Sequence, residues 1–165
     1  MPSANRFKFS RSRITSVEKK EEGRLTAVCR LVDTLCDMKV AVVVNVPEME
    51  IIQVQAAIER SPDPNERTAL AELPKLAGIR IGPGMTKIFK GIVGPATADS
   101  QLLFMLEEAC NGVILSLTRE MALQVPEDQD LTADAYQTMV KANIRLYNRC
   151  AAFAPGSSLV AGITP

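Results

Sequence analysis

The residues best suited to chemistry are four cysteines, in a chain of 165 residues that contains no histidine. The absence of histidine excludes Ser-His-Asp and Cys-His nucleophile pairs, histidine general bases and any histidine-containing zinc site. Cys29, Cys36, Cys110 and Cys150 show no Cys-x-x-Cys or other ligand spacing. Cys29 and Cys110 are predicted on buried faces, whereas Cys36 in a short loop is the candidate for exposure. We therefore predict inert free thiols in a reducing compartment, with no metal and no cofactor.

A glycine-rich stretch, LAGIRIGPGMT at 76–86, is the second feature that could do chemistry. Its hinge residues are Gly78, Gly82, Pro83 and Gly84. The stretch lacks the Gly-Lys-Ser/Thr ending of a P-loop and the GxGxxG spacing of a dinucleotide site, and it follows a helical pattern instead of a strand. We interpret it as a tight connection that packs its backbone against a sheet. Gly78 is predicted to take a positive φ as a helix C-cap.

The first half of the chain has the residue pattern of strands. The segment 24–33 places Leu25, Ala27, Cys29 and Leu31 on one face, with the period of two that a half-buried strand requires. Further strands are predicted at 38–46 and 49–60, and residues 6–19 are expected to be extended. Short loops join these segments, and parallel strands need long crossovers, so the strands should form an antiparallel meander.

The second half reads as helices. Asn65 is the predicted N-cap of a helix that Gly78 ends, and 91–95 is predicted as loop. Thr97 is predicted to cap a long helix to about 120, and Thr132 a last helix to about 153. The apolar stripe of the long helix comprises Leu102, Leu106, Ala109, Val113 and Leu117.

The predicted fold class is therefore α+β, a four-stranded antiparallel meander covered on one face by helices. The predicted organisation is a core domain at 6–122, an appended C-terminal helix at 123–154 and a flexible tail at 155–165.

Composition and charge set limits on the partners. Hydrophobic residues make up 47% and charged residues 23% of the chain, as in ordinary globular proteins. The formal net charge is zero, and residues 1–94 carry only four more basic than acidic side chains, which does not indicate nucleic acid. The basic residues near the start fit either contact with an anionic partner or protection of an edge strand, and we favour the edge strand. The sequence contains no apolar run typical of a secretory signal or a membrane span, so we predict a cytoplasmic protein without a membrane partner.

Several short motifs resemble a bacterial family of unknown function, domain-of-unknown-function family 2889. The similarity covers about residues 6–122. It is carried by Arg13-Ile14, by Leu31-Val32-Asp33-Thr34 with Asp37, by Ser61-Pro62, by the run from Leu76 to Gly84, and by Leu102. The resemblance implies an architecture more firmly than an activity, because the family has no established biochemical role.

This chain departs from the family pattern where relatives carry two cysteines and a histidine. Those positions are Glu66, Asp99 and Gln101 here. One interpretation is electrostatic, because carboxylates are favoured in the first turn of a helix. The other is an oxygen-rich cluster, flanked by Arg80 and Lys87, that binds a small polar ligand or a hard metal. Zinc and iron–sulfur clusters are not expected, since the soft ligands are missing.

Three functions remain open from the sequence. The leading hypothesis is a small binding or accessory protein whose partner is an unknown small molecule or protein. The second is an enzyme that uses Glu66 or Asp99 as general acid/base or as hard-metal ligands. The third is an interaction module that binds through its C-terminal helix, and homo-oligomerisation is left open.

Overall fold

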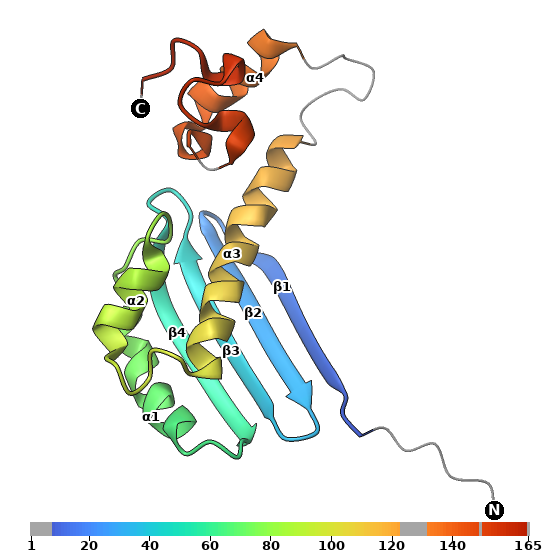
Figure 1. Ribbon diagram of the computed structural model, residues 1–165, viewed down its shortest axis with the longest axis vertical. Coiled ribbons are helices and arrows are strands. Elements are labelled where there is room, and N and C mark those ends of the chain that lie inside the picture. The colour runs from blue at the N-terminus through green and yellow to red at the C-terminus, as the bar shows by residue number, and fades with distance from the viewer. Residues whose placement is uncertain (1–7, 123–131, 149, 165) are drawn as a thin grey trace, which may run out of the picture. The chain divides into compact units, whose positions relative to one another are not determined.

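Four strands lie side by side in chain order (Figure 1). The computed structural model describes residues 8–122, 132–148 and 150–164. The strands are β1 (Arg11–Glu21), β2 (Arg24–Asp33), β3 (Asp37–Asn45) and β4 (Glu50–Arg60). Each pairs antiparallel with the next, which confirms the predicted α+β meander.

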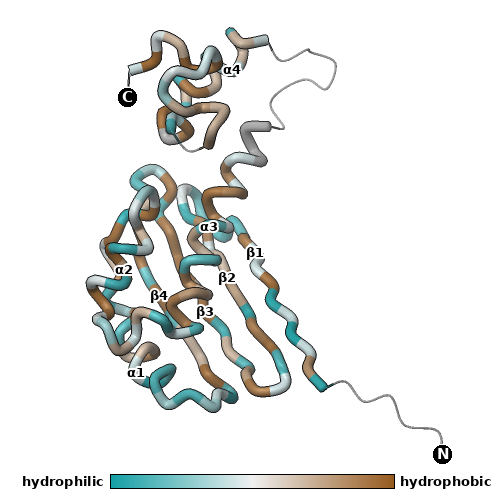
Figure 2. The backbone as a smooth tube through the Cα atoms, in the orientation of Figure 1, coloured by the Kyte–Doolittle hydropathy of each residue, from teal (hydrophilic) through white to brown (hydrophobic). Residues whose placement is uncertain are grey.

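One face of this sheet forms half of the hydrophobic core. The predicted inner face of β2 is confirmed, because Leu25, Ala27, Cys29 and Leu31 are all buried. Three helices cover this face, α1 (Asn65–Glu72), α2 (Met85–Val93) and α3 (Gln101–Ala122). Apolar residues recur along the central strands and along the helices that face them (Figure 2). Among the described helices, none combines the length and apolar character needed to cross a bilayer.

Helix α3 buries the stripe predicted for it. Leu102, Leu106, Ala109 and Val113 are fully buried in the core shared with the sheet. Farther along the same helix, a Cβ atom at Gly112 would lie 3.0 Å from Cγ2 of Thr15 in β1. Glycine at this position therefore allows the helix backbone to lie close to the edge strand.

The glycine-rich hinge pairs with the start of β4. The Ile51 N–H donates to the Ile79 carbonyl at 2.9 Å, and the Gly78 N–H donates to the Ile51 carbonyl at 2.7 Å. A third bond joins the Ile81 N–H to the Met49 carbonyl at 2.8 Å. The interpretation that the hinge packs its backbone against the sheet is thereby confirmed. Gly78 has the predicted positive φ of 86°, but Ala77, not Gly78, is the C-cap of the 3-10 turn Leu73–Leu76.

Three predicted helix boundaries are wrong. Pro64 occupies the N-cap of α1, and Asn65 is the first helical residue. Thr97 does not cap the long helix, since its hydroxyl donates to the Val93 carbonyl at 2.6 Å and α3 begins only at Gln101. Gly91, expected in a loop, lies within α2.

The described residues after Leu117 form a second compact unit. Its helix α4 (Ala133–Ala142) begins after Thr132, whose hydroxyl accepts the Ala135 N–H as predicted for a cap. The predicted continuation of this helix to 153 is wrong, because short 3-10 turns replace it. Val140 packs with Val160 and Ile163, which lie in the segment expected to be a flexible tail.

Asp33 organises the turn between β2 and β3. Its Oδ1 accepts the N–H groups of Leu35 at 2.7 Å and Cys36 at 2.6 Å, and its Oδ2 binds the Arg11 guanidinium. This turn buries Cys36, so the prediction that Cys36 is exposed is wrong; Cys150 is the exposed cysteine. Burial raises the pKa of the Cys36 thiol, and that of Cys110 to about 12, which makes both thiols poor nucleophiles.

We expect Gly78→Ala to destabilise the protein by about 1 kcal/mol, because alanine is strained at a φ of 86°. No heavy atom lies within 4 Å of a Cβ built at this position, so the cost isolates backbone strain. Gly91→Ala is the matched control, since residue 91 is helical and should gain roughly 0.5–1 kcal/mol. Urea unfolding of both variants measures the difference, and an unchanged midpoint for Gly78→Ala would contradict it.

We also expect Asp33 to make stability depend on pH. Burial works to raise the pKa of the Asp33 carboxyl, but the N–H groups of Cys36 and Leu35 and the Arg11 guanidinium outweigh it and lower the pKa. A lowered folded-state pKa gives stability that is present above the ordinary aspartate value of about 3.9 and is lost as the pH falls further. Urea unfolding should show Asp33→Asn less stable than the parent at about pH 6, with the difference shrinking toward about pH 2. A difference that stays constant with pH would rule this out.

Candidate binding groove

Glu66 joins helix α1 to the start of helix α3. Its Oε1 accepts the Gln101 N–H at 2.6 Å and its Oε2 accepts the Leu102 N–H at 3.1 Å. The residue is only 2% exposed, so both oxygens are enclosed where they bind the main chain. The first N–H groups of a helix have no partner within the helix, and a carboxylate satisfies them and complements the helix dipole. Glu66 therefore acts as a helix cap supplied from another element.

The neighbouring residues complete this cap. The Ser100 hydroxyl accepts the Leu103 N–H at 3.1 Å, so Gln101, Leu102 and Leu103 all have partners. On the other side, Asp63 Oδ1 accepts the Asn65 N–H at 2.9 Å and so fixes the start of α1. The start of α3 consequently has its first N–H groups occupied by protein side chains.

Asp99 and Gln101 line a separate small hollow of about 180 Å³ between α2 and the start of α3. Asp99 precedes the helix, so its predicted place in the first turn is wrong. Its side chain is 94% exposed and its Oδ1 lies 3.1 Å from the Lys90 Nζ. Glu66 does not line this hollow, and the three predicted residues do not form one pocket.

Glu107 lines the same hollow and was missed by the sequence analysis. Burial raises the pKa of its carboxyl, outweighing the nearby Lys90 and a hydrogen bond with Thr86. Its Oε1 is buried and has no hydrogen-bond partner among the described residues. The sequence spacing could have indicated Glu107, because position 107 follows Leu103 by four residues and therefore lies on the same side of the helix as this buried residue.

Arg80 and Lys87 contribute to neither feature. Both side chains are exposed, and Arg80 forms a backbone bridge to Glu50 beside β4. Across 8–122, 132–148 and 150–164 no three Cys, Asp or Glu side chains are placed to hold a metal ion together. The residues proposed from the sequence thus contribute mainly to helix capping and to the surface.

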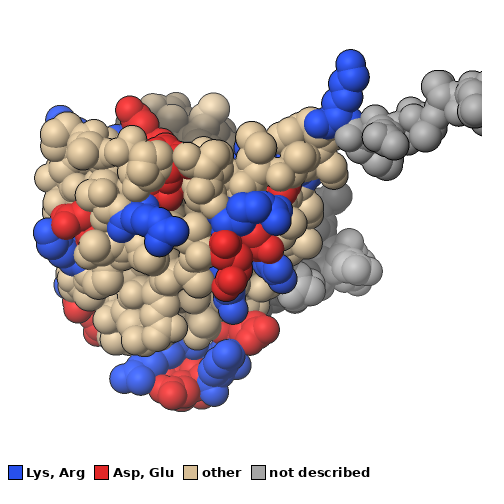
Figure 3. Space-filling view, turned by 90° about the horizontal axis from the view of Figure 1, so that it is seen from below, with Lys and Arg blue, Asp and Glu red and all other residues tan. Residues whose placement is uncertain are grey.

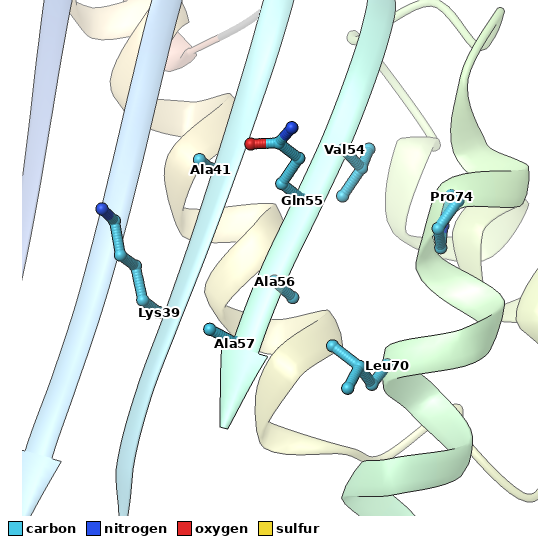
Figure 4. A pocket seen from close by; sticks show the side chains of 8 residues that line it. All are labelled: Lys39, Ala41, Val54, Gln55, Ala56, Ala57, Leu70 and Pro74. Atoms are coloured by element: carbon cyan, nitrogen blue, oxygen red, sulfur yellow. The ribbon is translucent and has the colours of Figure 1, made fainter. Parts of the chain in front are cut away.

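A larger groove of about 470 Å³ runs along the edge of the sheet at β4. Leu70 and Pro74 face β4 from the α1 side, and small side chains lie opposite them (Figure 4). The lining residues are Lys39, Ala41, Val54, Gln55, Ala56, Ala57, Leu70 and Pro74. The groove is therefore largely apolar and is bounded by a strand edge and a helix.

The main chain of β4 is unpaired along this groove. Ile51 bonds to the hinge, and β3 residues 39, 41 and 43 face β4 across the register Lys39↔Ala57, Ala41↔Gln55 and Val43↔Gln53. The Val46 N–H donates to the Gly23 carbonyl on the β2 side, so by alternation residues 43, 41 and 39 direct their main-chain groups toward β4 and bind residues 53, 55 and 57. The register shift between Val43 and Val44 adds one residue of β4 after Ile51, and beyond it the N–H and C=O groups of residues 54, 56 and 58 point away from β3. Within the described residues no segment pairs with this part of the edge.

The two sheet edges differ in charge. Strand β1 carries Arg11, Arg13, Glu18, Lys19, Lys20 and Glu21, and Arg13 lies 4.6 Å from the ring of Phe104. Residues 51–58 of β4, IIQVQAAI, carry no charge. Charged edges resist pairing with another strand, and an uncharged open edge accepts it. The β4 edge is thus the better place for an added strand.

Neither a family model, nor a curated protein, nor a solved structure matches this chain. The resemblance to domain-of-unknown-function family 2889 stays a prediction from short motifs. The groove must therefore be interpreted from its own geometry.

We expect Glu66→Ala to destabilise the protein by about 2–4 kcal/mol, because two buried N–H groups lose a charged acceptor. Glu66→Gln should cost less, since its amide oxygen keeps one acceptor. The control is Glu72→Gln, which breaks only a surface pair with Lys75 on the next turn and should change stability by less than about 0.5 kcal/mol. Urea unfolding at neutral pH compares the three variants. Equal losses for Glu66→Ala and the control would show that the cap is dispensable.

Proposed function

We propose that this protein is a binding or accessory module that holds an extended polypeptide segment in the groove beside β4. The observation that supports this most directly is the unpaired, uncharged edge at residues 53–58, flanked by Leu70 and Pro74. A segment added there would pair with the main chain of β4 as a fifth long strand. Strand addition to an open edge is a recurring mode of peptide recognition.

The groove supplies both parts of such recognition. Main-chain groups of residues 54, 56 and 58 would give affinity without regard to sequence. Side chains of the bound segment alternate between the two faces of the sheet. Every second one would therefore contact Leu70 and Pro74, where an apolar group is favoured.

The other hypotheses from the sequence have weaker support. Glu66 is an enclosed cap, so an acid/base role would require it to release two main-chain N–H groups. The apolar stripe of α4 is partly used within its own unit, where Val140 is fully buried. Figure 3, seen from below the view of Figure 1, shows basic and acidic residues interspersed on the visible face, without the single-sign patch typical of nucleic-acid binding. Cytoplasmic location is part of the proposal and follows from the sequence argument.

We expect peptides selected from a random nine-residue display library to bind this protein through β4. Ala56→Pro should weaken their binding about tenfold or more, because it removes an outward N–H and obstructs the edge. The fold should survive, since proline is tolerated on an edge strand where its missing N–H faces outward. Ala56→Ser is the matched control, because it keeps the N–H at the same position and should bind nearly as the parent does.

Binding is measured by fluorescence anisotropy, and hydrogen exchange reports whether the amides of residues 54 and 56 become protected. Circular dichroism and urea unfolding confirm that both variants are folded. Selection of no peptide, or equal binding by folded Ala56→Pro and Ala56→Ser, would disprove the proposed function.

A further inference from the structure

We infer that the bound segment carries an acidic side chain at the position opposite Ala57, where it forms an ion pair with Lys39. This inference rests on the proposed function and names the chemistry of its ligand. It makes the groove selective for acidic extended segments with apolar residues on the alternate positions.

Lys39 is the charged residue among those that line the groove. It is exposed, and it has no ion pair with any side chain in the described parts of the chain. Its neighbour across β2 is Arg30, which lies 3.5 Å from the carboxylate of Asp37. Asp37, two residues before Lys39 on β3, is therefore engaged by Arg30. Lys39 remains available to an anionic group of a ligand.

The register places a ligand side chain in line with Lys39. Lys39 lies directly opposite Ala57, and both side chains are on the sheet face that the helices leave open. An added strand would pair its own residue with Ala57 from the other side. Because the groups of residues 54, 56 and 58 point outward, that pair is the close, non-hydrogen-bonded kind.

Distance and size allow the ion pair to form. The Cα atoms of Lys39 and of the added residue would lie about 10 Å apart, the sum of one wide and one narrow antiparallel spacing. A lysine and a glutamate can span that separation, and only the methyl group of Ala57 stands between them. On one side of this row, the pair Ala41 and Gln55 carries no charge. On the other side, Asp37 lies 3.5 Å from Arg30, and Glu59, exposed two residues after Ala57, is the acidic group with which a ligand carboxylate competes for Lys39. An ion pair at such an exposed site adds selectivity more than affinity.

The test repeats the nine-residue library selection on the parent protein, on Lys39→Glu and on Lys141→Glu. The last variant makes the same charge change at an exposed residue of the second unit and so controls for net charge. We expect peptides selected by the parent and by Lys141→Glu to carry Asp or Glu at one fixed position of an alternating apolar pattern. Lys39→Glu should instead select Lys or Arg at that position.

The two proposals fail in different ways. Suppose that Ala56→Pro abolishes binding of the selected peptides but that these peptides share no fixed acidic position. That result would overturn the inference and leave strand addition standing. The same acidic position selected by Lys39→Glu would also overturn it. Selection of no peptide, or of peptides that Ala56→Pro does not affect, would overturn the proposed function and the inference together. An anisotropy titration of one selected acidic peptide and its Glu→Gln or Asp→Asn counterpart should show a loss of at least about threefold for the parent and none for Lys39→Glu.

Discussion

The contact between the Glu66 carboxylate and the first N–H groups of α3 joins α1 to α3 within the layer that covers the sheet. Helix α1 has only eight residues, too few to be stable by itself, and it gains a fixed position from this contact. Helix α3 in turn begins at a defined residue, which orients the stripe from Leu102 to Val113 toward the strands. At an exposed helix start, the first N–H groups can bind water when a side-chain partner is lost. At a buried helix start they have no such replacement and depend on the side chain.

The parts of the fold that local rules govern could be predicted from the sequence. The strands of the meander follow from apolar residues at every second position and from short connections. The positive φ of Gly78 follows from the need for a left-handed residue where the helical segment before it ends. The start of α3 could not be predicted in this way, because its cap comes from Glu66, 35 residues earlier. Thr97 has the local appearance of a cap, yet its hydroxyl closes the end of α2. The burial of Cys36 likewise depends on the turn that Asp33 holds together.

The candidate site was harder to predict than the fold, for a related reason. Sequence reasoning favours charged residues at helix starts, and here Glu66 satisfies the fold itself while Asp99 lies at the surface. A groove beside a strand depends on which strand is left at the edge and on which helix runs along it. The uncharged run at 51–58 was nevertheless visible in the sequence, and its contrast with the charged strand at 11–21 marks the open edge.

The hinge also limits what the groove can hold. Its residues 78–81 pair with the beginning of β4 and end their pairing at Ile51, and a register shift between Val43 and Val44 follows at once. An added strand can therefore use only about six residues, roughly 20 Å of β4. Three outward-facing residues each offer one N–H and one C=O, and each hydrogen bond contributes about 0.5–1.5 kcal/mol net. After the entropy of association is subtracted, binding in the micromolar range or weaker is the physical expectation. A groove of this length suits transient engagement of an exposed segment, in which a single ion pair beside the main-chain bonds can decide which segments are held.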